Sequence, residues 1–393
     1  MENVYTHKRY CSGCGVCAEC CPKNAITLKP DSMGYLYPEI DIAQCVDCGL
    51  CRKVCHMLDE YAANRKPYRI VALKSKDPDV LRTSQSGGAF AELAKCILID
   101  GGIVYGAAFD PQFRVAHIRI DRVEELYRLQ GSKYVQSQTA GIFSQVKRDL
   151  ELGRNVLFSG TPCQVAALHS FLGKAWDNLF CVDVVCHGVM PPRLWEDYLS
   201  YAKEKFGTYT QVKFRDKDVS GWRGSNQSFI INGKIRTSNT YSKLFYSNYF
   251  LRDVCCDSAN KRIICKYGGI QRCSDLTIGD FWGIEDTESA LPDNDTGISL
   301  CLINSEKGEH LFEKVSNRVF WETHSVADVT RRNPQLAEGE PYLPELAEKA
   351  RQEYLEKGFR YIAGKYADVG VKGVLRRLLR PVKLLLKSFC NTK

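Results

Sequence analysis

Two runs of closely spaced cysteines near the N-terminus carry the clearest chemical signal in this sequence. Both have the spacing C-x2-C-x2-C-x3-C; the first is Cys11, Cys14, Cys17 and Cys21, and the second is Cys45, Cys48, Cys51 and Cys55. Pro22 follows the first run, and His56 takes the same place after the second. Thiols at such spacing bind metal ions or iron–sulfur clusters, or pair as disulfides.

The redox setting argues against disulfides. The first residues, MENVYTHKRYC, lack the apolar region of a secretory signal. The chain also has no apolar run long enough to span a bilayer. We therefore expect a cytoplasmic protein, in which disulfides rarely persist. Its 19 cysteines then indicate metal binding.

The spacing favours [4Fe–4S] clusters over zinc. Tetrahedral zinc would need two C-x2-C pairs, whereas each run contains a triplet and a single cysteine. This is the pattern of bacterial two-cluster ferredoxins, in which the last cysteine of each run crosses to the other cluster. The predicted ligands are Cys11, Cys14, Cys17 and Cys55 for one cluster, and Cys45, Cys48, Cys51 and Cys21 for the other. Cys20 is left over as a packed free thiol.

The rest of the chain predicts an α/β domain. A short hairpin is expected within residues 25–38, between the two cysteine runs. After residue 67, strand-like segments (69–74, 103–109, 156–159 and 179–185) alternate with helix-like ones, such as 88–98 and the segment through 164–168. Asn232-Gly233 predicts a further hairpin. A G-x-G-x-x-G after a strand is absent, so the nicotinamide-binding fingerprint gives no support.

Two small-residue loops have both a binding and an ordinary interpretation. The loop SQSGGA, residues 84–89, opens a helix, where backbone amides can hold a phosphate. It is equally an ordinary N-cap. In GSKYV, residues 131–135, Lys133 could meet a phosphate or a flavin edge, although such lysines are more often solvated.

Two later cysteines follow predicted strands. Cys163 lies in SGTPCQ at a helix start, where backbone amides lower a thiol pKa. Cys186 lies in VVCHG at the end of the next strand. Ligands bind at this edge of open α/β sheets. The two thiols could be metal ligands, Cys163 could be a nucleophile with His187 as its base, or both could be inert and buried.

SGTPCQ, VVCHG, a later cysteine pair and DLTIGDFWG, behind a two-cluster ferredoxin, resemble the beta-subunit family of coenzyme F-420 hydrogenases and dehydrogenases. The resemblance covers about residues 1–320 and implies a flavin-binding iron–sulfur oxidoreductase. It implies a third [4Fe–4S] cluster on Cys163, Cys186, Cys255 and Cys265. Here the family's C-x2-C is replaced by a nine-residue spacing, so CDSANKRII (256–264) must loop out, and Cys256 competes with Cys255. Cys273 is a spare candidate.

The same resemblance assigns three loops to FAD. The implied contacts are Ser86, Gly87, Gly88, Lys133, Tyr134, Thr161, Gly279 and Asp280. Amides at 86–88 would hold the pyrophosphate, and Lys133 would balance charge on reduced flavin. A flavin suits this setting because it exchanges electron pairs with substrates and single electrons with clusters. The catalytic residues and the organic substrate are not identified by the sequence, and nothing requires a deazaflavin.

The expected organisation is an α+β ferredoxin-like module (1–62), an α/β flavin-binding domain with a mixed sheet in two parts (68–190 and 191–335), and a helical basic tail (340–393). Net charge is +8, and residues 371–393 hold seven Lys/Arg and no acid. The remainder is nearly neutral, which argues against nucleic-acid binding. The amphipathic tail suits a peripheral contact with an anionic membrane or an acidic partner, or packing on the domain.

Three functions remain open at this stage. The first is an enzyme that moves electrons between a donor or acceptor such as ferredoxin and an organic substrate at FAD. Some bacterial relatives of this kind accompany polysaccharide or cell-surface biosynthesis, by analogy only. The second is a non-catalytic electron-transfer subunit that feeds a partner enzyme. The third is a cysteine enzyme that uses Cys163.

Overall fold

The computed structural model describes residues 3–58, 64–292 and 295–367. Its centre is an eight-stranded mixed sheet with the order β14-β3-β13-β12-β7-β6-β4-β5. The strands are β3 (Arg69–Ser75), β4 (Ile103–Phe109), β5 (Val115–Ile120), β6 (Val156–Gly160), β7 (Leu179–Val184), β12 (Leu276–Asp280), β13 (Ser299–Ile303) and β14 (Val319–Thr323). Strands β4, β6, β7 and β12 run parallel, and the outer pairs are antiparallel. The α/β expectation with a mixed sheet is confirmed.

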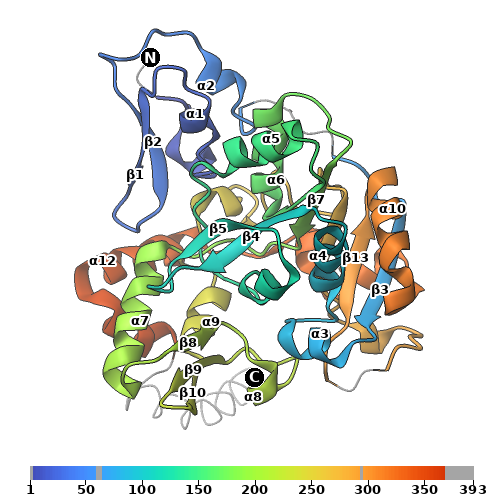
Figure 1. Cartoon of the computed structure of the whole chain (residues 1–393). Coiled ribbons are helices and arrows are strands. Elements are labelled where there is room, and N and C mark those ends of the chain that lie inside the picture. Colours follow the sequence, from blue (N-terminus) through green and yellow to red (C-terminus); the bar gives the residue numbers. More distant parts are fainter. Residues whose placement is uncertain (1–2, 59–63, 293–294, 368–393) are drawn as a thin grey trace, which may run out of the picture.

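Helices cover both faces of this sheet (Figure 1). On one face lie α3 (Pro78–Thr83), α4 (Ala89–Ile99) and α10 (Glu306–Val315), packed on Val71, Leu73 and Leu157. On the other face lie α5 (Ile142–Glu151) and α6 (Pro162–Leu172), packed on Val156 and Phe158. Successive residues of β6 thus enter opposite hydrophobic clusters, as expected of a strand buried on both sides.

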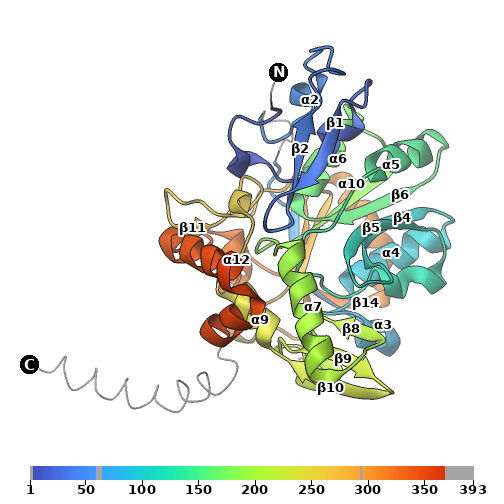
Figure 2. The same cartoon turned by 90° about the vertical axis from the view of Figure 1, so that its left-hand side faces the viewer.

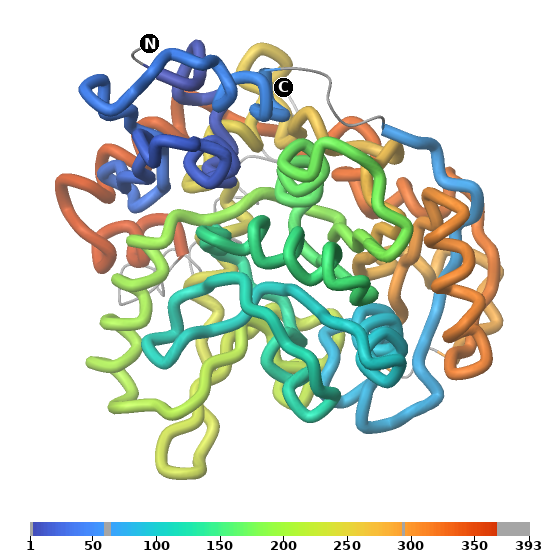
Figure 3. The backbone as a smooth tube through the Cα atoms, turned by 45° about the horizontal axis from the view of Figure 1, so that its top comes forward, coloured from blue at the N-terminus to red at the C-terminus, as the bar shows by residue number. Residues whose placement is uncertain are grey.

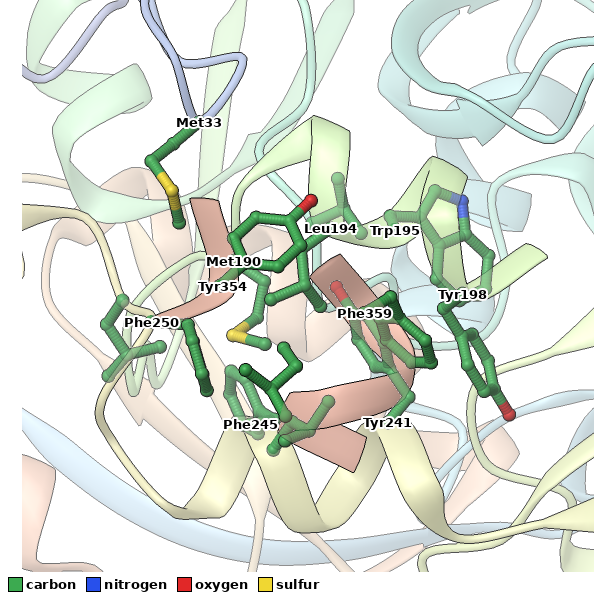
Figure 4. Close-up of a cluster of buried hydrophobic side chains, with 14 of the residues drawn as sticks. Met33, Met190, Leu194, Trp195, Tyr198, Tyr241, Phe245, Phe250, Tyr354 and Phe359 are labelled. Carbon is green, nitrogen blue, oxygen red and sulfur yellow. The ribbon is translucent and has the colours of Figure 1, made fainter. Parts of the chain in front are cut away.

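A second layer is built around three short strands: β8 (Gln211–Lys213), β9 (Gln227–Ile231) and β10 (Lys234–Ser238). The predicted hairpin is confirmed, since Asn232 and Gly233 join β9 to β10 with φ values of 49° and 74°. Helices α7 (Pro192–Phe206), α9 (Thr240–Tyr246) and α12 (Pro344–Tyr366) enclose an aromatic core, whose side chains Figure 4 shows.

Helix α12 differs from the surface helix that its mixed charge predicts. It breaks at Gly358, where φ is 75°, and both halves bury apolar residues, including Ala350, Tyr354 and Ile362. The first part of the expected tail is therefore part of the aromatic core. The basic segment after it, residues 371–393, lies outside the described residues.

The N-terminal residues form a hairpin and two short helices. The expected hairpin is confirmed as β1 (Ile26–Pro30) paired with β2 (Leu36–Ile40). Helices α1 (Val16–Glu19) and α2 (Leu50–Lys53) each lie within a cysteine run. The N-terminal segment sits against α5 and α6 (Figures 1 and 3), and Met33 from its hairpin turn reaches the aromatic core (Figure 4).

The remaining elements are short: α8 (Lys217–Ser220), β11 (Arg262–Ile263), α11 (Val326–Thr330) and β15 (Glu340–Pro341). Strand β11 pairs with β15 close to α12, as Figure 2 shows. Among the described helices, none is both long and apolar enough to cross a membrane.

Candidate cofactor sites

The two N-terminal cysteine runs fold alike. Gly15 and Gly49 adopt positive φ values of 78° and 71°, and each begins a short helix that carries the third cysteine of its run. The residues before the second cysteines, Gly13 and Asp47, also have positive φ, at 69° and 52°. The local backbone that presents each triplet is therefore repeated, as the repeated spacing predicts.

The structure gathers Cys11, Cys14, Cys17 and Cys55, here called the first cysteine group. Burial and the neighbouring thiols of Cys11 and Cys55 raise the pKa of Cys14 to about 12. Burial also raises the pKa of Cys17, which has three further members of the group beside it: Cys14, Cys11 and Cys55. The amide of Gly13 donates to Cys11 Sγ at 3.4 Å. Cys55, from the second run, thus sits with the first triplet.

A second cysteine group lies nearer the surface. Cys21, Cys45, Cys48 and Cys51 line one small cavity beneath β1 and β2. Cys48 is exposed, and the amide of Ala25 donates to Cys21 Sγ at 3.3 Å. Cys20 is close to this group, but its thiol donates to the carbonyl of Cys17 at 3.4 Å.

A third cysteine group forms at the carboxyl edge of the large sheet. Burial raises the pKa of Cys255 well above its ordinary value, and the neighbouring thiols that raise it further include Cys186, Cys265 and Cys163. Strands β6 and β7 are parallel neighbours, so the residues that follow them, Cys163 and Cys186, emerge at the same edge.

The structure corrects one expectation for Cys163. Helix-terminal amides were expected to lower its pKa, but burial and the nearby thiols of Cys265 and Cys186 raise it to about 12. Its Sγ lies 3.1 Å from Thr161 Oγ1, and Thr161 forms a capping box with Gln164 at the start of α6. Desolvation outweighs the helix terminus here.

The geometry also separates the two candidates for the third position. Cys255 faces the group, and a Cβ added to Gly188 would lie 3.4 Å from the Cβ of Cys255. Cys256 points elsewhere: its thiol donates to the carbonyl of Arg252 at 3.8 Å. Asp257 and Arg262 exchange backbone hydrogen bonds, so the insertion 256–264 does loop out as expected.

A buried arginine lies beside the third group. Arg272 is 1% exposed, and its Nε and Nη2 have no hydrogen-bond partner. Its charge lowers the pKa of both Cys186 and Cys265, against the larger effect of burial on each thiol. Unpartnered buried guanidinium nitrogens are costly unless an anionic group faces them. Sequence inspection missed Arg272, because nothing local distinguishes it from a solvated arginine.

One cavity of about 310 Å³ opens at the same sheet edge. Every implied FAD contact except Gly87 lines it: Ser86, Gly88, Lys133, Tyr134, Thr161, Gly279 and Asp280. Its wall also includes Cys14 of the first cysteine group, and Cys163 and Cys186 of the third. The cavity therefore adjoins both groups.

Gly87 acts behind the cavity wall. A Cβ at this position would lie 2.3 Å from the carbonyl oxygen of Leu73 and 2.6 Å from the amide nitrogen of Ser299. Only glycine lets the loop pack this closely on β3 and β13. Beside it, Gly88 (φ 92°) begins α4, and Gln85 lines the cavity with an unpartnered Nε2. This loop fits an anionic ligand such as a pyrophosphate.

Two basic side chains of the cavity are held neutral or near neutrality. Lys133 Nζ donates to the carbonyls of Arg128, Leu129 and Gln130, and burial lowers its pKa to about 7. His117, which sequence inspection did not select, lies between Ser137 Oγ at 2.7 Å and the carbonyl of Ser159 at 3.0 Å. Burial lowers its pKa to about 4.

Asp280 of the GDFWG loop is fully engaged with protein groups. Arg215 Nη1 donates to its Oδ2 at 2.6 Å, and Trp222 Nε1 donates to its Oδ1 at 2.7 Å. Trp222 in turn stacks on Trp282 at a centroid distance of 5.2 Å. The carboxylate therefore shapes the cavity wall, and the backbone at Gly279 is the part of this loop that can approach a ligand.

Among residues 3–58, 64–292 and 295–367, no three His, Cys, Asp or Glu side chains are arranged to hold a single metal ion. A [4Fe–4S] cubane makes a different demand, because each thiolate binds its own iron corner. Its ligands surround a group of atoms and do not converge on one point.

Comparison with known families agrees with this geometry. Residues 10–57 match the 4Fe-4S dicluster domain, and residues 153–329 match the family described as the C-terminal part of the beta subunit of coenzyme F420 hydrogenase/dehydrogenase. Residues 153–329 belong to this beta-subunit family. The third cysteine group lies wholly inside the beta-subunit region, and both N-terminal groups lie inside the dicluster domain. The SQSGG loop and Lys133 precede the matched residues.

Two relatives extend the comparison. The F-type subunit of the F(420)H(2) dehydrogenase of Methanosarcina mazei is 22% identical over 228 residues, which are 51% of this chain and 64% of that protein. The chain thus spans less than two thirds of that relative. The solved F420-reducing [NiFe] hydrogenase complex of Methanosarcina barkeri contains a chain that is 17% identical, with a TM-score of 0.43, covering 76% of this chain and 92% of that one.

Proposed function

We propose that the chain is an iron–sulfur flavoprotein oxidoreductase in which clusters exchange electrons with an FAD that acts on an organic substrate. One observation carries this proposal. The cavity lined by the implied flavin contacts is also walled by Cys14, Cys163 and Cys186. A flavin held there would adjoin ligands of two clusters.

The cysteine groups fit three [4Fe–4S] clusters. The first and second groups would hold the clusters of the dicluster domain, with Cys55 and Cys21 exchanged between the runs. Backbone amides at Gly13 and Ala25 already donate to ligand sulfurs, which stabilises the thiolate form. The third group would hold the third cluster, with Cys255 and not Cys256. The unpartnered nitrogens of Arg272 support a negatively charged group at that position.

The cavity fits FAD through several chain segments. The loop at Ser86–Gly88 and the free Nε2 of Gln85 would bind the pyrophosphate. Thr161 and the backbone at Gly279 would border the ring, where a Cβ on Gly279 would approach Val185 Cγ2 to 2.8 Å. When bound, FAD supplies conversion between electron pairs and single electrons. Lys133 is positioned by three carbonyls, so it borders the ligand as a weakly basic group.

External electrons would enter at the second cysteine group. Its Cys48 is exposed, whereas Cys14 and Cys17 of the first group are deeply buried. A small redox protein such as ferredoxin could approach this surface, and the buried first group would then lie between the entry point and the cavity. The same order works in reverse if the substrate is oxidised.

The substrate class stays a proposal. The name of the M. mazei relative suggests reduced coenzyme F420 as one candidate, and substrates of polysaccharide or cell-surface biosynthesis are others. The same name, which is that of one subunit of a dehydrogenase, favours a second candidate function: an electron-transfer subunit that feeds a partner enzyme without acting on a substrate.

Anaerobic purification tests the proposal. We expect about twelve irons per chain, one FAD, flavin absorbance and a broad iron–sulfur band. Cys163→Ser should remove about four irons and leave the dicluster signals intact. Loss of all iron in this variant, or colourless parent protein without sulfide, would contradict it. Stopped-flow reoxidation of the reduced flavin by candidate substrates then separates an enzyme from a relay subunit.

A further inference from the structure

His56 occupies the place that proline takes after the first cysteine run, and its surroundings explain the difference. The side chain is 0% exposed. Its Nε2 lies 3.2 Å from Ser12 Oγ, which belongs to the loop between Cys11 and Cys14. Its Nδ1 lies 2.7 Å from Tyr267 Oη, which belongs to the loop after Cys265. Both ring nitrogens therefore have partners, and they come from different domains.

The backbone of His56 is held by the same loop of the beta-subunit region. Tyr267 Oη donates to the His56 carbonyl at 2.9 Å, and Lys266 Nζ donates to this carbonyl at 2.9 Å. Tyr267 is only 2% exposed, and its ring lies 5.4 Å from the imidazole, centroid to centroid. Two consecutive residues after Cys265 are thus bound to the residue that directly follows Cys55.

One arrangement of protons satisfies every bond in this network. The Tyr267 hydroxyl proton is used by the His56 carbonyl, so Nδ1–H must donate to Tyr267 Oη. Nε2 is then an acceptor, and the Ser12 hydroxyl donates to it. A proline at position 56 could supply neither ring nitrogen. It would keep the carbonyl but lose the bonds that orient it.

The network joins two cysteine groups. Cys55 belongs to the first group and Cys265 to the third, and each is within two residues of the network. We propose that His56 and Tyr267 are positioning residues that hold the first and third clusters at a fixed separation, so that a single electron passes directly between them. The step oxidises one cluster and reduces the other, and no other reactant is needed. This inference rests on the proposed function.

Other contacts keep the N-terminal module in place when this network is removed. Thr139 Oγ1 donates to the carbonyl of Cys14 at 2.7 Å, and Ser170 Oγ donates to the carbonyl of Val54 at 2.6 Å. Tyr35 Oη donates to the carbonyl of Val189 at 2.8 Å. A substitution at Tyr267 should therefore change the local alignment of the two loops without detaching the module.

The test uses the full-length chain, reconstituted anaerobically, with Tyr267→Phe as the main variant and His56→Pro as the second. Tyr354→Phe is the matched control, because it removes another buried hydroxyl, bonded to Asp197 at 2.6 Å, from the aromatic core. Iron and FAD are counted first. The magnetic interaction between reduced clusters is then measured by electron paramagnetic resonance, and the rate of electron arrival at the third cluster by rapid freeze-quench after mixing with dithionite.

We expect Tyr267→Phe to keep its iron and FAD, to show an altered spin–spin splitting, and to slow electron arrival by roughly tenfold, since displaced reaction partners lose rate steeply. The control should match the parent protein. Parent-like splitting and rate in Tyr267→Phe would overturn the inference, as would loss of its iron, which would make the hydroxyl a support for cluster binding. If His56→Pro fails to fold, Tyr267→Phe decides. About eight irons in the parent would instead overturn the proposed function.

Discussion

Arg252 donates a hydrogen bond from Nε to the backbone carbonyl of Cys11 at 2.9 Å. The same guanidinium donates to the carbonyl of Leu36 at 3.0 Å and to Gln136 Oε1 at 2.7 Å. It also lies over the ring of Tyr37, 4.4 Å from its centroid. One buried side chain from the loop before the third cysteine group therefore anchors the module that holds the first and second groups.

Replacing this side chain should weaken the attachment of the N-terminal module. Hydrogen bonds from a charged donor contribute about 1.5–3 kcal/mol each, and removing the buried charge recovers part of that sum. We expect Arg252→Met to lower the free energy of unfolding by about 3 kcal/mol, measured by anaerobic thermal denaturation. Arg360→Met, which removes an exposed ion pair with Glu204, is the control and should cost less than about 1 kcal/mol. Equal losses in the two variants would contradict the anchoring role.

The identity of the third ligand in the third group can be tested directly. The structure turns Cys255 toward Cys186 and Cys265, whereas the thiol of Cys256 donates to the carbonyl of Arg252. We expect Cys255→Ala to lose about four irons and Cys256→Ala to keep all of them. Iron and sulfide analysis of both variants, prepared side by side, checks this. The reverse pattern would assign the ligand to Cys256.

Local sequence patterns could predict the parts of this architecture that depend on neighbouring residues. The cysteine spacing places Cys55 with Cys14, and the strand ends place Cys163 beside Cys186, because repeated loops and parallel strands follow from local signals. Arg252, Arg272 and the partner of His56 could not be found in this way. Their environments are made by segments up to about 240 residues apart in the chain, and a buried arginine looks like a solvated one until the fold closes around it.

Gly87 should be required for the flavin loop. A methyl group there would overlap the carbonyl of Leu73 and the amide of Ser299, so Gly87→Ala must displace the loop. We expect a loss of about 1–3 kcal/mol in stability and a clear fall in bound FAD, with the iron content kept. Gly153→Ala is the control: its φ of 73° strains an alanine, but its surroundings are open. It should be destabilised by about 1 kcal/mol and keep its FAD.

His117 should make stability depend on pH. Burial lowers its pKa from 6.5 to about 4, so between these values the unfolded chain binds a proton that the folded chain does not. This neutral histidine therefore contributes stability above pH 6.5 that is lost as the pH falls toward 4. Between pH 7.5 and 5, the parent protein should lose about 2 kcal/mol relative to His117→Gln. Denaturant unfolding at several pH values measures this difference, and parallel curves for the two proteins would contradict it.

Arg272 should set the reduction potential of the third cluster. Its charge acts on Cys186 and Cys265, and its Nε and Nη2 are buried without partners. Cluster potentials depend on net charge and on hydrogen bonds to sulfur, and a nearby cation favours the more negative, reduced state. Arg272→Met should therefore shift the potential downward by about 60 mV, which corresponds to about 1.4 kcal/mol for one electron.

The measurement is a redox titration of the signal that Cys163→Ser removes. Arg262→Met is the matched control for Arg272→Met, because it deletes the same charge from the insertion between Cys255 and Cys265, where the arginine pairs with Glu338 at the surface. Solvent screens that exposed charge, so its removal should leave the potential nearly unchanged. Equal shifts in the two variants would mean that net charge alone sets the potential, and an unchanged potential in Arg272→Met would place the guanidinium out of contact with the cluster.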